Sequence, residues 1–136
     1  LYEEFLKETR KGHPWMKRTI DGNLLKYYTF RRNGELMVEY SRMMLAGAPD
    51  NPGFLTTLAE GYMLQGMEAE GMEAYRRVLD VAPDDLHALL SLGNFYALKD
   101  DDASRVKAME YLEKAYAIHA TPYVAATLET LRRTVK

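Results

Sequence analysis

The residues able to support acid–base or metal chemistry are few and scattered. The three histidines, His13, His87 and His119, share no i, i+3 or i+4 spacing that would let two of them hold one metal ion. There is no cysteine, which excludes disulfides and thiolate metal sites. No nucleophile–base–acid set, phosphate-binding glycine loop or nucleotide fingerprint can be assembled. We therefore expect a protein that is not an enzyme and has no cofactor or metal.

Three consecutive aspartates, Asp100, Asp101 and Asp102, are the densest acidic run. A calcium loop needs alternating ligands, a glycine and a distal glutamate, and the run lacks all three. A solvated turn explains it better, with Asp102 or Ser104 as the N-cap of a helix that follows.

Basic and aromatic residues interleave near the N-terminus, as they do in proteins that bind single-stranded nucleic acid. The cluster consists of Lys17, Arg18, Lys26, Tyr27, Tyr28, Arg31 and Arg32. The competing interpretation is a solvated basic helix, and Tyr28 belongs to the core pattern described below.

The net charge of −2 conceals an uneven distribution. Residues 1–33 carry eight Lys and Arg against four Asp and Glu, residues 34–102 carry four against thirteen, and residues 103–136 carry six against three. Because the acidic middle would repel a phosphate backbone, we expect no nucleic-acid binding along the whole chain.

A 34-residue repeat supplies the elements that must position any site. Tyr28, Tyr62 and Tyr96 stand 34 residues apart, and Pro49 and Pro83 keep the same interval. Around the second and third tyrosines, Leu55, Leu58 and Ala59 recur as Leu89, Leu92 and Gly93. Each unit cannot bury its apolar face alone, so neighbouring units must stack.

Within residues 52–85 the spacing predicts two antiparallel helices. Leu55, Leu58, Ala59 and Tyr62 form one helical stripe. A second stripe, Gly71, Met72, Tyr75, Val78 and Leu79, follows the Gln65–Gly66 turn. We expect Ala59 and Gly71 to face each other and to let the two helix axes approach closely.

Similar pairs are predicted on both sides. Residues 86–122 repeat the plan with three extra residues in the turn near residues 99–104, and residues 18–51 keep the register through Leu24, Leu25 and Tyr28. The second helix of the 18–51 unit has two possible inner stripes. One is Met37, Val38 and Met44, and the other, which we prefer, is Leu36, Met37, Tyr40, Met43 and Met44.

The remaining segments lie outside these pairs. Residues 1–17 are expected to form a leading helix, with Tyr2, Phe5, Leu6 and Thr9 on one face, and a linker. Residues 122–135 are expected to form a closing helix with the stripe Val124, Leu128 and Leu131.

The pattern in residues 52–85 resembles the tetratricopeptide repeat (TPR), a 34-residue helix–turn–helix unit. The matching residues are Leu55, Leu58, Ala59, Tyr62, Gly71, Tyr75, Val78 and Pro83. The resemblance extends to residues 86–122, and to residues 18–51, where Asp21 replaces the first large residue. It implies an all-α chain of antiparallel helix pairs stacked in a right-handed superhelix, an α-solenoid, whose first helices line a concave groove for a peptide or helix.

The resemblance also implies which side chains line that groove. They are Lys26, Thr29, Phe30, Thr56, Glu60, Met63, Leu64, Leu90, Asn94, Ala97 and Leu98, with His87 at the edge, where its charge could switch binding between about pH 5 and 7. Some family members clamp a terminal carboxylate with Lys, Arg and Asn. Only Asn94 fits that pattern, so an amphipathic segment with apolar anchors suits the groove better.

These observations favour a non-catalytic protein–protein interaction module, a scaffold or assembly factor. The alternatives are a self-associating or structural repeat segment of a larger protein, and an RNA-contacting repeat domain. No apolar run approaches the roughly 20 residues that cross a bilayer, so we expect no membrane insertion, and the compartment stays open. Because the chain begins at Leu1, we expect a processed product or a fragment.

Overall fold

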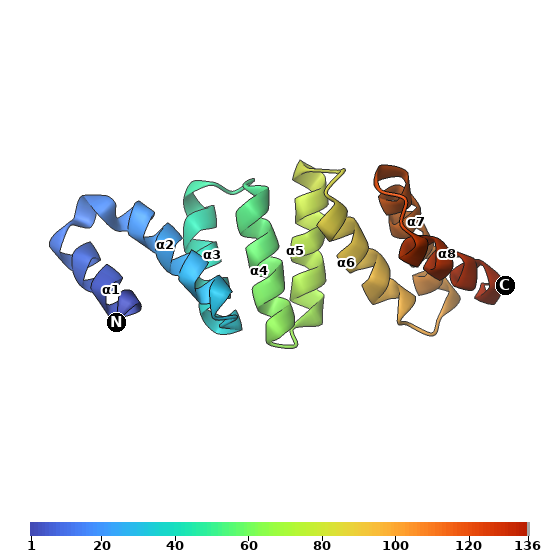
Figure 1. The fold of residues 1–136 in the computed structure, drawn as a ribbon, viewed down its shortest axis with the longest axis horizontal. Helices are drawn as coiled ribbons and strands as arrows, with labels where there is room; N and C mark the ends of the chain where they lie inside the picture. Colours follow the sequence, from blue (N-terminus) through green and yellow to red (C-terminus); the bar gives the residue numbers. More distant parts are fainter. Residues whose placement is uncertain (136) are drawn as a thin grey trace. The chain divides into compact units, whose positions relative to one another are not determined.

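The computed structural model describes residues 1–135, and within them the chain is all-α, with no strand (Figure 1). The helices are α1 Tyr2–Gly12, α2 Lys17–Phe30, α3 Gly34–Gly47, α4 Pro52–Leu64, α5 Glu68–Val81, α6 Leu86–Ala97, α7 Asp102–Ile118 and α8 Pro122–Thr134, with a short 3-10 turn at Pro14–Met16. None of these helices is long and apolar enough to span a bilayer.

Side-chain caps begin most of the helices after α2. Asn33, Asn51, Asp85, Asp101 and Thr121 each accept a hydrogen bond from a backbone N–H in the first turn of the following helix. These bonds satisfy N–H groups that have no partner within the helix. Both candidates predicted for the α7 N-cap were wrong, Asp102 by one residue and Ser104 by three, because Asp101 is the N-cap and accepts from both the backbone N–H and the hydroxyl of Ser104.

The chain divides into two compact units, Leu1–Ala74 and Tyr75–Lys136, and the boundary falls within α5.

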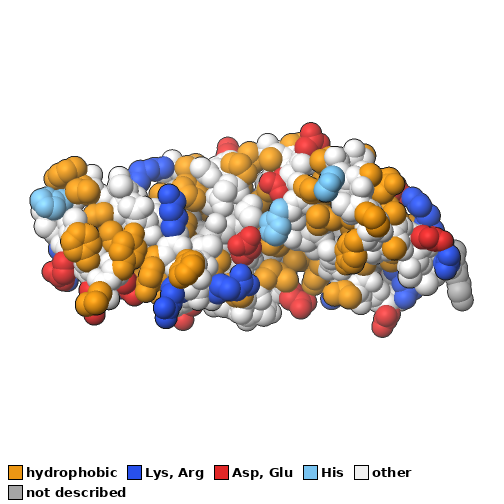
Figure 2. Space-filling model, viewed as in Figure 1, with side chains coloured by type: hydrophobic (Ala, Val, Ile, Leu, Met, Phe, Trp, Pro, Cys, Tyr) orange, Lys and Arg blue, Asp and Glu red, His pale blue; other side chains and the backbone are white. Residues whose placement is uncertain are grey.

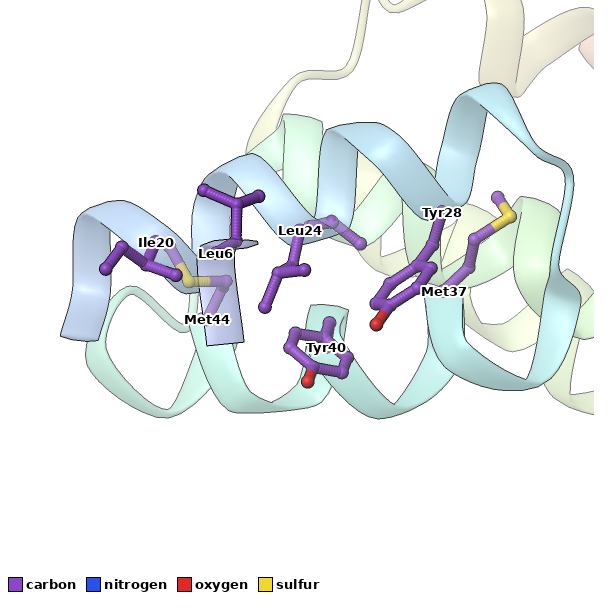
Figure 3. Packing of buried hydrophobic residues seen from close by; sticks show 8 residues of the cluster. Leu6, Ile20, Leu24, Tyr28, Met37, Tyr40 and Met44 are labelled. Carbon is purple, nitrogen blue, oxygen red and sulfur yellow. The ribbon is translucent and has the colours of Figure 1, made fainter. Parts of the chain in front are cut away.

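In the first unit, α1, α2 and α3 enclose one apolar core. Leu6, Ile20, Leu24, Leu25, Tyr28, Met37, Tyr40 and Met44 are its buried residues. Figure 3 shows Tyr28 of α2 pointing toward the ring of Tyr40 in α3, and the two ring centroids are 5.1 Å apart. Because Tyr40 is buried and Val38 is only half-buried, the preferred inner stripe of α3 is the correct one.

Polar contacts attach α1 to α2. The hydroxyl of Tyr28 donates a 2.7 Å hydrogen bond to the carboxylate of Glu3. Lys7, 2.9 Å away, and this hydroxyl together lower the pKa of Glu3, because both stabilise its charged form. Burial and the Glu3 carboxylate raise the pKa of Tyr28, so the phenol stays protonated as a donor.

Asp21 of α2 is a buried carboxylate that pairs with one cation from α1 and one from α2. It is 2% exposed, 2.9 Å from Lys17 Nζ and 3.4 Å from Arg10 Nε of α1. Asp21, which replaces the first large residue of the repeat pattern, therefore lies inside α2, and this helix runs unbroken through Asp21 and Gly22.

Small residues allow close helix approach beyond α3. A Cβ built on Gly61 of α4 would lie 3.0 Å from the carbonyl oxygen of Gly34 and from Met37 Cβ in α3. A Cβ on Gly71 of α5 would lie 2.6 Å from Met63 Sδ and 3.4 Å from the carbonyl oxygen of Ala59. The predicted approach of Ala59 to Gly71 is therefore confirmed.

In the second unit, α6 and α7 pack closely and α8 covers α7 (Figure 1). A Cβ on Gly93 would stand 2.7 Å from two carbons of Leu112, which is fully buried. Val124, Leu128 and Leu131 form the buried stripe of α8, as predicted. The side chains of α5 in this unit contact α6, with the Tyr75 ring edge-on to His87 at 5.6 Å between centroids.

Candidate functional site

A hollow of about 700 Å³ opens within the first unit beside α2, the end of α3 and the start of α4. We call it the α2–α4 hollow. Its lining residues are Arg18, Thr19, Gly22, Asn23, Leu25, Lys26, Thr29, Met44, Gly53, Phe54 and Thr57.

The α2 wall of the hollow follows helical spacing. Arg18, Gly22, Leu25 and Thr29 stand at i, i+4, i+7 and i+11, which is one stripe of α2. The absent side chain of Gly22 leaves Met44 at the floor, since a Cβ at Gly22 would lie 3.7 Å from Met44 Cε. Beside its core stripe, α2 therefore presents a second, partly apolar stripe, and Leu25 belongs both to the core and to the lining of the hollow.

The α4 wall is set by the cap of that helix. Asn51 accepts a 3.1 Å hydrogen bond from the backbone N–H of Phe54, and Pro52 occupies the first helical turn. This start places Gly53, Phe54 and Thr57 along the hollow. The hydroxyl of Thr57 donates to the carbonyl oxygen of Gly53 at 3.0 Å, so its donor is already satisfied within α4.

The α2–α4 hollow combines an apolar floor with a positively charged wall. Leu25 and Met44 are buried, and half-buried Phe54 packs against the core. Arg18 and Lys26 are exposed, and no Asp or Glu is among the lining residues. Figure 2 shows Lys and Arg side chains beside apolar ones on the part of the surface where α2 lies. The surface can bury an apolar group and attract negative charge at the same time.

A second hollow, of about 500 Å³, lies beside α1 and the 3-10 turn. Four cations line it, and each has a carboxylate within the first unit. Lys7 pairs with Glu3, Lys11 with Glu8, and both Arg10 and Lys17 with Asp21. Because these walls neutralise their own charge, this hollow offers less to a charged ligand.

Of the predicted groove residues in the first unit, the α2–α4 hollow includes Lys26 and Thr29. Phe30 is outside its lining and 83% exposed at the end of α2. Thr56, Glu60, Met63 and Leu64 are also outside it. Met63 is half-buried against Gly71, and Leu64 lies beside Gly34 at the other end of α4. The hollow thus uses the first turns of α4, whereas the prediction extended to its last turns.

The predicted residues of the second unit lie on or beside α6. His87 Nε2 is 3.4 Å from the hydroxyl of Tyr75, Leu90, Asn94 and Ala97 are half-buried, and Leu98 is 84% exposed. Their part in binding stays a prediction.

The predicted groove did not include Arg18, Asn23, Phe54 or Thr57, although the sequence had placed Arg18 in the basic and aromatic cluster. A usable signal was the stripe from Arg18 to Thr29, which is a face of α2 distinct from the core stripe through Ile20, Leu24 and Tyr28. The lining of the α2–α4 hollow contains no Asp and no His. Within residues 1–135 no group of three or more His, Cys, Asp and Glu is placed to hold a metal ion.

Comparison with known proteins gives a structural match only. No family model and no curated protein matches the sequence. Among solved structures, the chain is similar to a Bacteroides ovatus ATCC 8483 protein whose assignment as a protein-binding protein is itself provisional. The TM-score is 0.74 at 18% sequence identity, over 97% of this chain and 87% of the other. At that identity the match shows a shared fold.

Proposed function

We propose that this chain is a non-catalytic protein-interaction module, a scaffold or assembly factor, that receives a segment of another protein in the α2–α4 hollow. The observation that carries the proposal is an open hollow of about 700 Å³ whose floor is apolar. Apolar anchors that enter such pockets supply most of the affinity in this kind of interface. The hollow belongs, on this proposal, to the concave face of a TPR-like stack of helix pairs.

Two further points support the proposal. The provisional assignment of the Bacteroides ovatus protein is of the same kind. The lining residues also offer hydroxyl, amide, cationic and apolar groups without a nucleophile–base pair, which suits recognition better than turnover.

Thr57→Trp tests the proposal, because it fills the hollow with a neutral ring while leaving the buried stripe of α4 intact. Thr130→Trp in α8 is the matched control, since Thr130 is also a helical threonine whose hydroxyl donates to the carbonyl four residues earlier. In a pull-down, we expect a partner captured by the wild type and Thr130→Trp to be lost with Thr57→Trp. Thermal melting of both variants should match the wild type. Capture of the same partner at full yield by Thr57→Trp would exclude this hollow as the interaction surface.

A further inference from the structure

We propose that the segment received by the α2–α4 hollow is acidic, with two carboxylates flanking an apolar side chain. This inference rests on the proposed function and specifies its partner. It is carried by the arrangement of Arg18, Lys26 and the apolar floor.

The first step concerns charge. Arg18 and Lys26 are exposed in the hollow, and within the described part of the chain neither has a carboxylate within ion-pair distance. Lys7, Arg10 and Lys17 of the same unit are all paired. Two cations in a wall without acidic residues give a positive field that no carboxylate of the wall neutralises, and a negatively charged occupant complements it.

The second step concerns spacing. Arg18 and Lys26 are eight residues apart on α2, which corresponds to about 12 Å along the helix axis. Leu25 and Met44 lie at the floor of the same hollow. An occupant that meets both cations while burying an apolar group has acid, apolar and acidic positions in that order. A helix supplies them at i, i+4 and i+7, and an extended segment at i, i+2 and i+4.

The third step concerns preorganisation. The Arg18 guanidinium lies against Gly47 at the end of α3, where a Cβ would collide with Nη1 of Arg18. Because Gly47 has no side chain, the guanidinium can lie against the backbone at the C-terminus of α3, where backbone carbonyls favour a cation. A cation already held in place loses less conformational entropy on binding than a free one.

The same features favour a peptide over a nucleic acid. A strand of nucleic acid needs a track of cations and exposed aromatic platforms. This hollow offers two cations, and Phe54, its one lining aromatic ring, is half-buried and packed against the core.

The test measures fluorescence anisotropy of labelled synthetic helical peptides with the folded chain at low and physiological salt. One peptide carries glutamates at i and i+7 and leucine at i+4, a second has both glutamates changed to glutamine, and a third has the leucine changed to serine. A short single-stranded RNA of similar length is the fourth probe. We expect the acidic peptide to bind at least about tenfold more tightly than the glutamine peptide, and the serine peptide to lose binding.

Variants localise the effect. Arg18→Gln and Lys26→Gln should each weaken the acidic peptide about threefold. Arg31→Gln makes the same charge change at the end of α2, outside the hollow lining, and should leave affinity unchanged. Gly47→Ala, which displaces Arg18, should act in the same direction as Arg18→Gln.

Several outcomes would overturn the inference. Equal affinity for the glutamate and glutamine peptides, equal losses for Arg18→Gln and Arg31→Gln, tighter binding of the RNA, or no binding by any peptide each contradicts it. If the glutamine peptide binds as well as the acidic one and Thr57→Trp abolishes both, the acidic preference fails and the proposed function survives. If Thr57→Trp leaves all peptide binding unchanged, both fail.

Discussion

At the residue scale, close contacts between helices depend on single missing side chains. Gly61, Gly71 and Gly93 each sit where a Cβ would come within 3.0 Å of a neighbouring helix or its side chains. Met63 at Gly71 ends in a flexible thioether that can move. Leu112 at Gly93 is different, because its branched carbon is fully buried and has no space to move into.

Gly93→Ala should therefore destabilise the second unit by about 1 to 3 kcal/mol, since overpacking outweighs the gain in helix propensity. Gly22→Ala is the control. It is also mid-helix but would make only ordinary contact with Met44, so we expect a gain of about 0.5 to 1 kcal/mol. Urea unfolding measures both. A Gly93→Ala protein as stable as the wild type would contradict the packing of α6 on α7 described above.

At the element scale, ionic contacts hold α1 against α2. Asp21 occupies the repeat position that Leu55 and Leu89 fill with fully buried leucines, and Arg10 reaches it from α1. A carboxylate there is tolerated because two cations accompany it, and removal of one cation leaves buried charge less compensated.

Arg10→Met should lower the free energy of unfolding by about 2 kcal/mol. This loss is smaller than the loss on breaking a fully buried ion pair, because Lys17 still pairs with Asp21. Asp21→Leu in the same background should restore stability, since the charge is gone and the position regains the leucine of the other repeats. Lys11→Met is the control, because its exposed partner Glu8 makes a surface pair worth less than about 1 kcal/mol. Chemical denaturation of the four proteins gives the values. Failure of Asp21→Leu to recover the loss would mean that Arg10 acts through packing alone.

At the scale of the whole molecule, charge is segregated along the chain, with basic ends and an acidic middle. Such a distribution offers an alternative use, pairing between copies of the chain. On the proposed function the partner is instead a segment of another protein, received by the α2–α4 hollow with its exposed cations and apolar floor.

We therefore expect the chain to be monomeric in sedimentation velocity from low micromolar to high micromolar concentration at physiological salt. Pairing between copies would depend on attraction between the basic ends of one copy and the acidic middle of another. Physiological salt screens such attraction between exposed charges. A concentration-dependent dimer that Thr57→Trp dissociates would instead make a second copy the occupant of the hollow.

Much of this protein could be read from the sequence because the signals are local. Periodicity placed the buried stripes through Leu55, Leu58 and Tyr62 correctly, because a stripe depends only on residues three and four apart in the chain. The cap of α7 was predicted wrongly because Asp101, Asp102 and Ser104 are all able to cap a helix, and only the backbone geometry selects Asp101.

The tertiary structure alone decided which side chains meet across helices. No spacing in the sequence indicates that Arg10 reaches Asp21, or that the bare backbone of Gly47 receives the guanidinium of Arg18. Nor does it show that the start of α4, with Phe54 and Thr57, completes a hollow begun by Arg18 and Lys26 on α2. Helical periodicity depends on hydrogen bonds between residues four apart in the chain, so the sequence determines it locally. The α2–α4 hollow depends on the distance between α2 and α4, which the packing of both helices on α3 determines.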